Sequence, residues 1–228
     1  SSDVCSSDLS ASVMRLSITS TKEEIKKCVA TLIEKNNIPN SGIRLIIAGG
    51  DAPDGYTITQ PHLIIIQQPL DPPPTTLSSK GIQLVSYFYQ RQLAEVKTTD
   101  YLMAIHLQPW MKSQGADDIL YYNNDSVCEC PRSNIFMVTY DNIIVTPARN
   151  MLKGITRKNI IQVAATQNWK LEQRDISLEE MKTAKEVFIS SSTKRIIPVK
   201  GLDEQNFSLN LDNSISAQIF NHLLALEN

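Results

Sequence analysis

A proline-rich segment, "PLDPPPTTLSSKG" at residues 69–81, constrains the fold of this chain more than any other stretch. Four of its thirteen residues are prolines and four carry hydroxyl groups. This composition cannot build a core helix or strand and is typical of a linker. The chain has 228 residues, of which 42% are hydrophobic, so it can bury a core on each side of the linker. We therefore predict a small N-terminal domain over 11–68 and a larger domain over 82–228.

The N-terminal part predicts a small α+β unit. Thr21 and Glu24 have the spacing of a capping box, and apolar residues follow at helical spacing, so we expect a helix over 21–36. The text "IRLIIAGG" and "HLIIIQQ" predicts two strands. The stretch "SSDVCSSDLS" has neither the charged nor the apolar region of a signal peptide and repeats SSD. We expect residues 1–10 to be foreign or disordered.

For the larger domain, the order of segments predicts an α+β fold class with a mixed, mainly antiparallel sheet and flanking helices, and not a doubly wound parallel sheet. Helical spacing occurs over 98–113, over 155–166, after a cap at Ser177 with Glu180, and around Ile215 to Leu224. A hairpin turn is predicted at 140–142. Strands are predicted by the segments "IQLVSYFYQ", "DILYYN", "SVCEC", "NIFMVTY", "NIIVTP", "EVFIS" and "RIIPV".

Composition argues against several classes of protein. The net charge is -2 without a block of like charge, which gives no support for a nucleic-acid or anionic membrane surface. The apolar runs are far shorter than the roughly 20 residues that span a bilayer. The four cysteines, Cys5, Cys28, Cys128 and Cys130, do not form a disulfide framework pattern, and a reduced, cytoplasmic setting fits them best. None of the three histidines lies near Cys128 and Cys130, so we expect no metal site.

Three separate segments carry residue types that one chemistry would use together. Lys97, in "EVKTTDYL", is either a solvated charge or an amine able to form a Schiff base. Glu129, in "CECPRSNIF", is either an outward strand residue or a buried carboxylate that needs a cationic or protonated partner. Gly154 opens a helix whose unpaired N–H groups favour phosphate, although a glycine here is more often only a turn. The serine run in "FISSSTKR" adds hydroxyl and amide donors.

The order "KTTDYL … ECPRSNIF … VTPARNMLKGITR … SSSTKRIIPV" resembles the class IV, fold-type IV pyridoxal-phosphate aminotransferases. That family includes branched-chain amino acid aminotransferases, D-amino acid aminotransferases and aminodeoxychorismate lyases. The resemblance runs from about Arg15 to the C-terminus and is most specific between Lys97 and Val199. Four motifs in the same order over about a hundred residues are a stronger signal than any one of them.

The resemblance implies a role for each matching residue. Lys97 would hold pyridoxal phosphate as an internal aldimine and move the proton during catalysis. Glu129 would face the pyridine nitrogen and keep it protonated, which also gives the buried carboxylate its partner. The remaining implied contacts are Leu152 on the ring face, the amides of Ile155 and Thr156 with Ser191 and Ser192 on the phosphate, Thr193 near the substrate carboxylate, and, more loosely, Tyr101 in the active site.

The implied reaction transfers an amino group between an amino acid and a 2-oxo acid by a ping-pong mechanism. The Arg-x-His pair of D-amino acid enzymes is not found in "GGDAPDGYTITQPHLI", so branched-chain or hydrophobic L-amino acids are favoured. An aminodeoxychorismate lyase that releases pyruvate is the alternative, and a truncated non-catalytic relic is another.

The family normally has an N-terminal segment ahead of the part that matches Arg15, with an arginine that grips the phosphate. We expect the chain to be N-terminally truncated and to bind the cofactor less tightly for that reason, and we do not assign Arg15 to the phosphate. Family members are usually homodimers, so the resemblance also implies a homodimer. Arg157, which follows Thr156, has no role in this chemistry, and we expect it to form a structural ion pair.

Overall fold

The computed structural model describes residues 9–124, 126–209 and 212–227 of the chain. The chain divides into two compact units, Ser1–Pro72 and Pro73–Asn228, which we call unit 1 and unit 2. The division between them falls inside the proline-rich segment 69–81.

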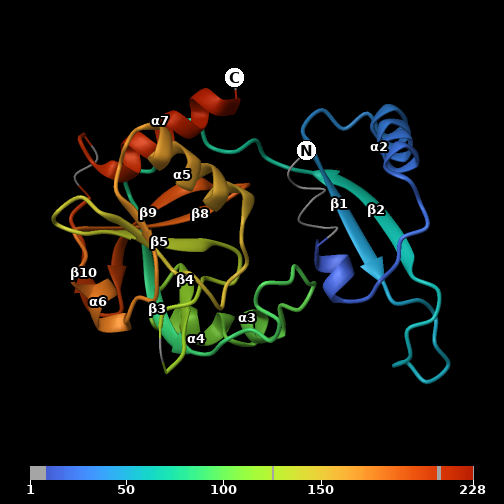
Figure 1. Ribbon diagram of the computed structural model, residues 1–228, viewed down its shortest axis with the longest axis horizontal. Coiled ribbons are helices and arrows are strands. Elements are labelled where there is room, and N and C mark those ends of the chain that lie inside the picture. The colour runs from blue at the N-terminus through green and yellow to red at the C-terminus, as the bar shows by residue number, and fades with distance from the viewer. Residues whose placement is uncertain (1–8, 125, 210–211, 228) are drawn as a thin grey trace. The chain divides into compact units, whose positions relative to one another are not determined.

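Unit 1 contains a helix and a two-stranded antiparallel sheet. Helix α2 (Lys22–Asn36) packs against β2 (His62–Pro69), which pairs with β1 (Ser41–Ala48) (Figure 1). The predicted capping box is confirmed, because the Glu24 N–H donates to Thr21 Oγ1 at 3.2 Å and the Thr21 N–H donates to the Glu24 carboxylate at 2.7 Å. Helix α2 has no buried residue, so this unit holds little core.

The first residues of the chain are only partly described. Residues 1–8, which include Cys5, lie outside the described ranges. Residues 9–13 are helical, and Ser10 and Ala11 are buried. The disorder expected for residues 1–10 therefore does not extend to Leu9 and Ser10.

Unit 2 is built on one large mixed sheet with the strand order β4-β3-β9-β8-β5-β6-β7, and β10 pairs with β9. The pairings of β3 with β4, β3 with β9 and β6 with β7 are parallel, whereas β5–β6, β5–β8, β8–β9 and β9–β10 are antiparallel. The mixed sheet of an α+β fold is thus confirmed. The strands are β3 (Ile82–Phe88), β4 (Asp118–Tyr122), β5 (Asn134–Val138), β6 (Ile144–Thr146), β7 (Leu171–Gln173), β8 (Glu186–Ser191), β9 (Arg195–Leu202) and β10 (Gln205–Asn206).

The sheet of unit 2 is buried on both faces. In β5, Phe136 and Val138 belong to one core cluster and Ile135 and Met137 to another, as the two-residue period of a strand requires. Helices α5 (Ile155–Thr166) and α7 (Ile215–Glu227) pack together and cover the Phe136 face (Figure 1). Helix α6 (Leu178–Lys182) contributes Met181 to the opposite cluster. The Phe136 and Phe188 rings stack with their centroids 5.0 Å apart.

The helix predicted over 98–113 is wrong in its extent. The structure has two short helices instead, α3 (Leu102–His106) and α4 (Gln108–Ser113), joined at Leu107. Pro109 lies in the first turn of α4 and has no N–H to donate to the preceding turn, so one continuous helix cannot form. Together with the chain around Tyr121, these two helices enclose a third core cluster.

One predicted strand is wrong, and two strands were not predicted. Residues 126–130, "SVCEC", form no strand, only isolated bridges that pair Tyr122 with Val127 and Cys130 with Ser133. Cys128 and Cys130 pack into different core clusters. Strands β7 and β10 were not predicted, since three and two residues are too few to show a pattern.

The described residues contain no helix with the length and apolar character needed to cross a lipid bilayer. Within the same residues, no group of three or more His, Cys, Asp or Glu side chains is arranged to hold a metal ion. The described cysteines, Cys28, Cys128 and Cys130, are all free thiols.

Candidate active site

Glu129 is a buried carboxylate with donors on both oxygens. Its residue is 4% exposed, so the outward strand alternative is wrong. Arg91 donates to Glu129 Oε1 from Nε at 2.8 Å and from Nη2 at 2.7 Å. The backbone N–H of Leu152 donates to Oε2 at 3.0 Å. The required cationic partner is therefore supplied by this chain, and sequence reasoning missed it.

The charge of Glu129 is set by opposing effects. Burial raises the pKa of Glu129 above its ordinary value, because a carboxylate loses its hydration inside the protein. The Arg91 guanidinium, the Leu152 N–H and the Lys97 ammonium each lower that pKa, and Arg91 has the largest effect of the three. Lys97 has the smallest effect of the three.

Lys97 lies in an irregular segment and not at the end of a strand. Strand β3 ends at Phe88, a turn follows over 92–95, and α3 begins at Leu102. The Lys97 side chain is exposed to solvent. Two carbonyl groups of the segment that leads to it, those of Ala94 and Val96, accept hydrogen bonds from Arg91 at 2.6 and 3.5 Å. The position of Lys97 is thus tied to the side chain that holds Glu129.

The loop before α5 approaches Asn134 closely. The amide of Asn134 donates to the Leu152 carbonyl at 2.7 Å, so Leu152 is held through both its N–H and its carbonyl group. A Cβ added at Gly154 would collide with Asn134 Oδ1, which explains why the smallest residue stands there. Asn134 pairs with Ser190 across β5 and β8. The start of α5 and the end of β8 therefore meet at Asn134.

This meeting point presents donors that lack acceptors. Helix α5 begins at Ile155 after Gly154, and no side chain caps it. The first N–H groups of a helix have no partner inside the helix and carry the positive end of its dipole. The hydroxyl groups of Ser190 and Ser191 are buried and have no hydrogen-bond partner among the described residues. Because buried polar groups are nearly always bonded, this arrangement suits an anionic ligand.

The other predicted residues lie around these two ends. Thr156 is the second residue of α5, and Ser192 and Thr193 lie in the exposed turn between β8 and β9. Leu152 is half-buried. The start of α5 and the serine hydroxyls have donors that suit a phosphate, and Glu129 is an acceptor that suits a protonated ring nitrogen, as pyridoxal phosphate requires. The described chain therefore has the residues that could hold this cofactor.

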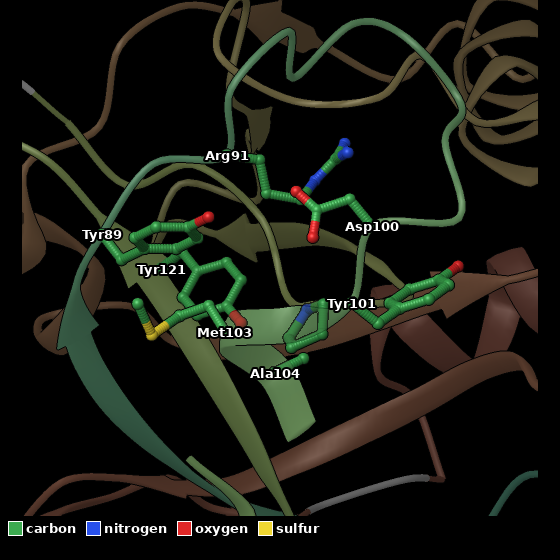
Figure 2. A pocket seen from close by; sticks show the side chains of 8 residues that line it. Tyr89, Arg91, Asp100, Tyr101, Met103, Ala104 and Tyr121 are labelled. Atoms are coloured by element: carbon green, nitrogen blue, oxygen red, sulfur yellow. The ribbon is translucent and has the colours of Figure 1, made fainter. Parts of the chain in front are cut away.

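A small cavity opens beside Arg91. Figure 2 shows Arg91 and Asp100 together, with the rings of Tyr89 and Tyr121 close to each other. Those two rings are 5.0 Å apart in an edge-to-face arrangement. Tyr101, which is 37% exposed, also lines the cavity, together with Met103, Ala104 and Pro131. The volume of about 10 Å³ admits a single water molecule.

Arg157 does not form the predicted ion pair. Its Nη2 donates to the carbonyl of Pro147 at 2.9 Å and to Oε1 of Gln173 at 3.0 Å. The residue is 4% exposed, and burial lowers its pKa. Its Nε has no partner in the described part of the chain. The prediction is wrong because neutral oxygens from β7 and the loop before α5 surround the guanidinium.

Proteins of known sequence resemble this chain over most of its length. A D-alanine aminotransferase of Staphylococcus epidermidis is 25% identical over 216 residues, which cover 92% of this chain and 76% of that protein. The chloroplastic branched-chain-amino-acid aminotransferase 5 of Arabidopsis thaliana is 34% identical over 145 residues, which cover 58% of this chain and 34% of that protein.

Solved structures share the fold. A provisionally assigned 4-amino-4-deoxychorismate lyase of Legionella pneumophila has a TM-score of 0.84 at 24% identity and covers 97% of this chain and 82% of its own. The branched-chain aminotransferase of the archaeon Thermoproteus uzoniensis, solved with norvaline, has a TM-score of 0.80 at 23% identity and covers 95% and 75%. Another branched-chain amino acid aminotransferase of this fold was solved with pyridoxamine 5'-phosphate. The homodimer stays a prediction, because the structure holds one chain. The family model for amino-transferase class IV matches residues 8–202, and the chain therefore belongs to that family.

Proposed function

We propose that this chain uses pyridoxal phosphate to transfer an amino group between a hydrophobic L-amino acid, with branched-chain amino acids favoured, and a 2-oxo acid. The observation that supports the proposal is a chain of contacts that links the segment of Lys97, the buried Glu129 carboxylate and the loop before α5. Arg91 binds both Glu129 and the Val96 carbonyl, next to Lys97. Glu129 also binds the Leu152 N–H, and α5 begins three residues later at Ile155, near the hydroxyls of Ser190 and Ser191.

In this proposal the start of α5 and the serines bind the phosphate, whereas Glu129 and Lys97 act on the ring and on the substrate. The amides of Ile155 and Thr156 and the hydroxyls of Ser191 and Ser192 bind the cofactor's phosphate. Glu129 accepts a hydrogen bond from the protonated ring nitrogen. When bound, pyridoxal phosphate supplies an electron sink that accepts the electrons released at the substrate Cα. Lys97 would hold the cofactor through Nζ, and the same amine would accept the proton from the substrate Cα.

The favoured substrate class rests on the sequence. The chain shares 34% identity with a branched-chain aminotransferase over 145 residues and has no Arg-x-His pair in residues 49–64. D-Amino acids are a second candidate, because a relative that aligns with 92% of the chain is named D-alanine aminotransferase. The cavity near Arg91 does not decide between them, since it admits no more than a single water molecule.

The decisive experiment combines absorption with a substrate panel. The purified chain with pyridoxal phosphate should develop the visible band of a lysine-bound cofactor, and Lys97→Ala should lose it. Lys170→Ala removes a lysine from an exposed ion pair with Glu172 and should keep the band. A band that persists in Lys97→Ala would refute the role of Lys97, and no band in the parent would favour a non-catalytic relic.

The substrate panel separates the candidate reactions. With 2-oxoglutarate as acceptor, we expect L-leucine to be converted at least tenfold faster than D-alanine, a ratio equal to about 1.4 kcal/mol of transition-state discrimination. The reverse order would show D-amino acid specificity. Release of pyruvate from aminodeoxychorismate, without transfer from leucine, would show that the chain is the lyase.

A further inference from the structure

Arg91 contacts two parts of the site at once. Its Nε and Nη2 both donate to Glu129 Oε1, at 2.8 and 2.7 Å. On the other side, Nη2 donates to the Ala94 carbonyl at 2.6 Å and Nη1 reaches the Val96 carbonyl at 3.5 Å. Val96 directly precedes Lys97. One side chain therefore joins the carboxylate to the segment that carries the lysine.

The burial of this ion pair separates it from the other arginine pairs that the structure describes. The side chains of Arg91 and Glu129 are 12% and 6% exposed, whereas those of Arg149 and Asp175 are 54% and 43% exposed. Taking two charges out of water costs free energy that their attraction often fails to recover. A buried pair at this position is therefore weak support for stability and calls for another role.

We propose that Arg91 is a positioning residue of the cofactor site, which holds the Glu129 carboxylate in place and anchors the segment that presents Lys97. This inference rests on the proposed function, since it assigns Arg91 to the same site. Arg91 touches neither the substrate nor the reacting atoms in this proposal. It acts through Glu129 and through the backbone at Ala94 and Val96.

Replacing Arg91 should change the protonation of Glu129 in a known direction. The charged groups that act on Glu129 are Arg91 and Lys97, and the thiols of Cys128 and Cys130 flank it. Without the guanidinium, burial is opposed only by the Leu152 N–H and Lys97, so the pKa of Glu129 rises further. A protonated Glu129 no longer favours the proton on the ring nitrogen. The pH above which the cofactor binds tightly should therefore move upward.

The test compares cofactor affinity in a double-mutant cycle. Pyridoxal phosphate binding is titrated by absorption in the parent, Arg91→Met, Glu129→Gln and the double variant, across pH. Arg91→Met should weaken binding at neutral pH by about tenfold or more in the parent background. In the Glu129→Gln background the loss should be several-fold smaller, because only the anchoring of Ala94 and Val96 is then removed. Arg91→Lys keeps the positive charge but loses the several N–H donors of the planar guanidinium. Its affinity for pyridoxal phosphate should lie between those of Arg91→Met and the parent.

A matched variant controls for loss of structure. Arg174 also donates two hydrogen bonds to one carboxylate, that of Glu180, at 2.6 and 2.9 Å, and this pair lies outside the site. Arg174→Met should therefore leave both the affinity for pyridoxal phosphate and its pH dependence unchanged. If Arg91→Met binds within about twofold of the parent, or loses the same factor in both backgrounds, the inference is overturned. A parent that forms no visible band would overturn the proposed function as well, so the two failures are distinguishable.

Discussion

The two ends of the site differ in how far the chain itself completes them. At the carboxylate end, formed by Arg91, Glu129 and the Leu152 N–H, both oxygens of a buried carboxylate have donors. At the hydroxyl end, formed by Gly154, the start of α5 and Ser190–Ser192, buried hydroxyls have no partner among the described residues. The carboxylate end is organised before any ligand arrives. The hydroxyl end keeps hydrogen-bonding groups that the described residues do not use.

The largest expected effect is at the carboxylate end. Glu129→Gln keeps the shape of the side chain but removes the charge that favours a protonated ring nitrogen, so kcat should fall on the order of 100-fold. Steady-state transamination measures this loss. Glu180→Gln, which neutralises the half-exposed carboxylate beside Arg174, is the matched control and should stay within about twofold. Equal losses in both variants would mean that the carboxylate end has no special part in catalysis.

The second effect is at the boundary between the ends. Gly154→Ala places a methyl group against Asn134 Oδ1, so Asn134 must move and its bond to the Leu152 carbonyl weakens. We expect the unliganded protein to lose about 1–3 kcal/mol in its free energy of unfolding, and cofactor affinity to fall about tenfold. Urea unfolding and absorption titration measure the two quantities. Gly49→Ala, where the added Cβ comes no closer than 3.8 Å to any side chain, should change neither.

The hydroxyl end could be predicted from the sequence because its signals are local. A glycine, a helix start and a serine run each occupy a few consecutive residues, and α5 begins at Ile155 as predicted. The carboxylate end could be predicted only in part. Glu129 was identified through the order of motifs, but its partner Arg91 lies 38 residues earlier, and only the tertiary fold brings the two together.

Two other contacts could not be predicted because tertiary packing makes them, and one helix boundary was missed although the sequence signals it. The environment of Arg157 depends on Pro147 and Gln173, which no spacing rule connects to it. The role of Asn134 depends on a loop 18 residues away. The break between α3 and α4 was different, since Pro109 stood in the predicted helix and signals a boundary there. Local chemistry was predictable, whereas contacts made by tertiary packing were not.

A third prediction separates ligand binding from folding at the hydroxyl end. Because Ser191 Oγ has no partner among the described residues, Ser191→Ala should not lower the stability of the unliganded protein. Cofactor binding should weaken by about 1 kcal/mol, or roughly fivefold, through one lost hydrogen bond. Ser177→Ala is the opposite control, since it removes the cap on the Glu180 N–H and should cost about 1 kcal/mol of stability without changing affinity. If Ser191→Ala destabilises the unliganded protein, its hydroxyl already has a partner.

The smallest expected effect tests whether the ionised form of Glu129 destabilises the unliganded protein. Burial raises the pKa of Glu129 above its ordinary value of 4.5. A carboxyl group whose pKa is higher in the folded protein contributes stability that is fully present below the unfolded pKa and is lost as pH rises through the folded pKa. Urea unfolding of the unliganded parent and Glu129→Gln, from about pH 4 to 8, should therefore show the parent losing stability relative to the variant as pH rises. A difference that stays constant, or grows in the parent's favour, would mean that Arg91 and the Leu152 N–H fully offset burial. The decrease we expect would show that the Glu129 charge still costs free energy in the unliganded protein, although both of its oxygens have hydrogen-bond donors.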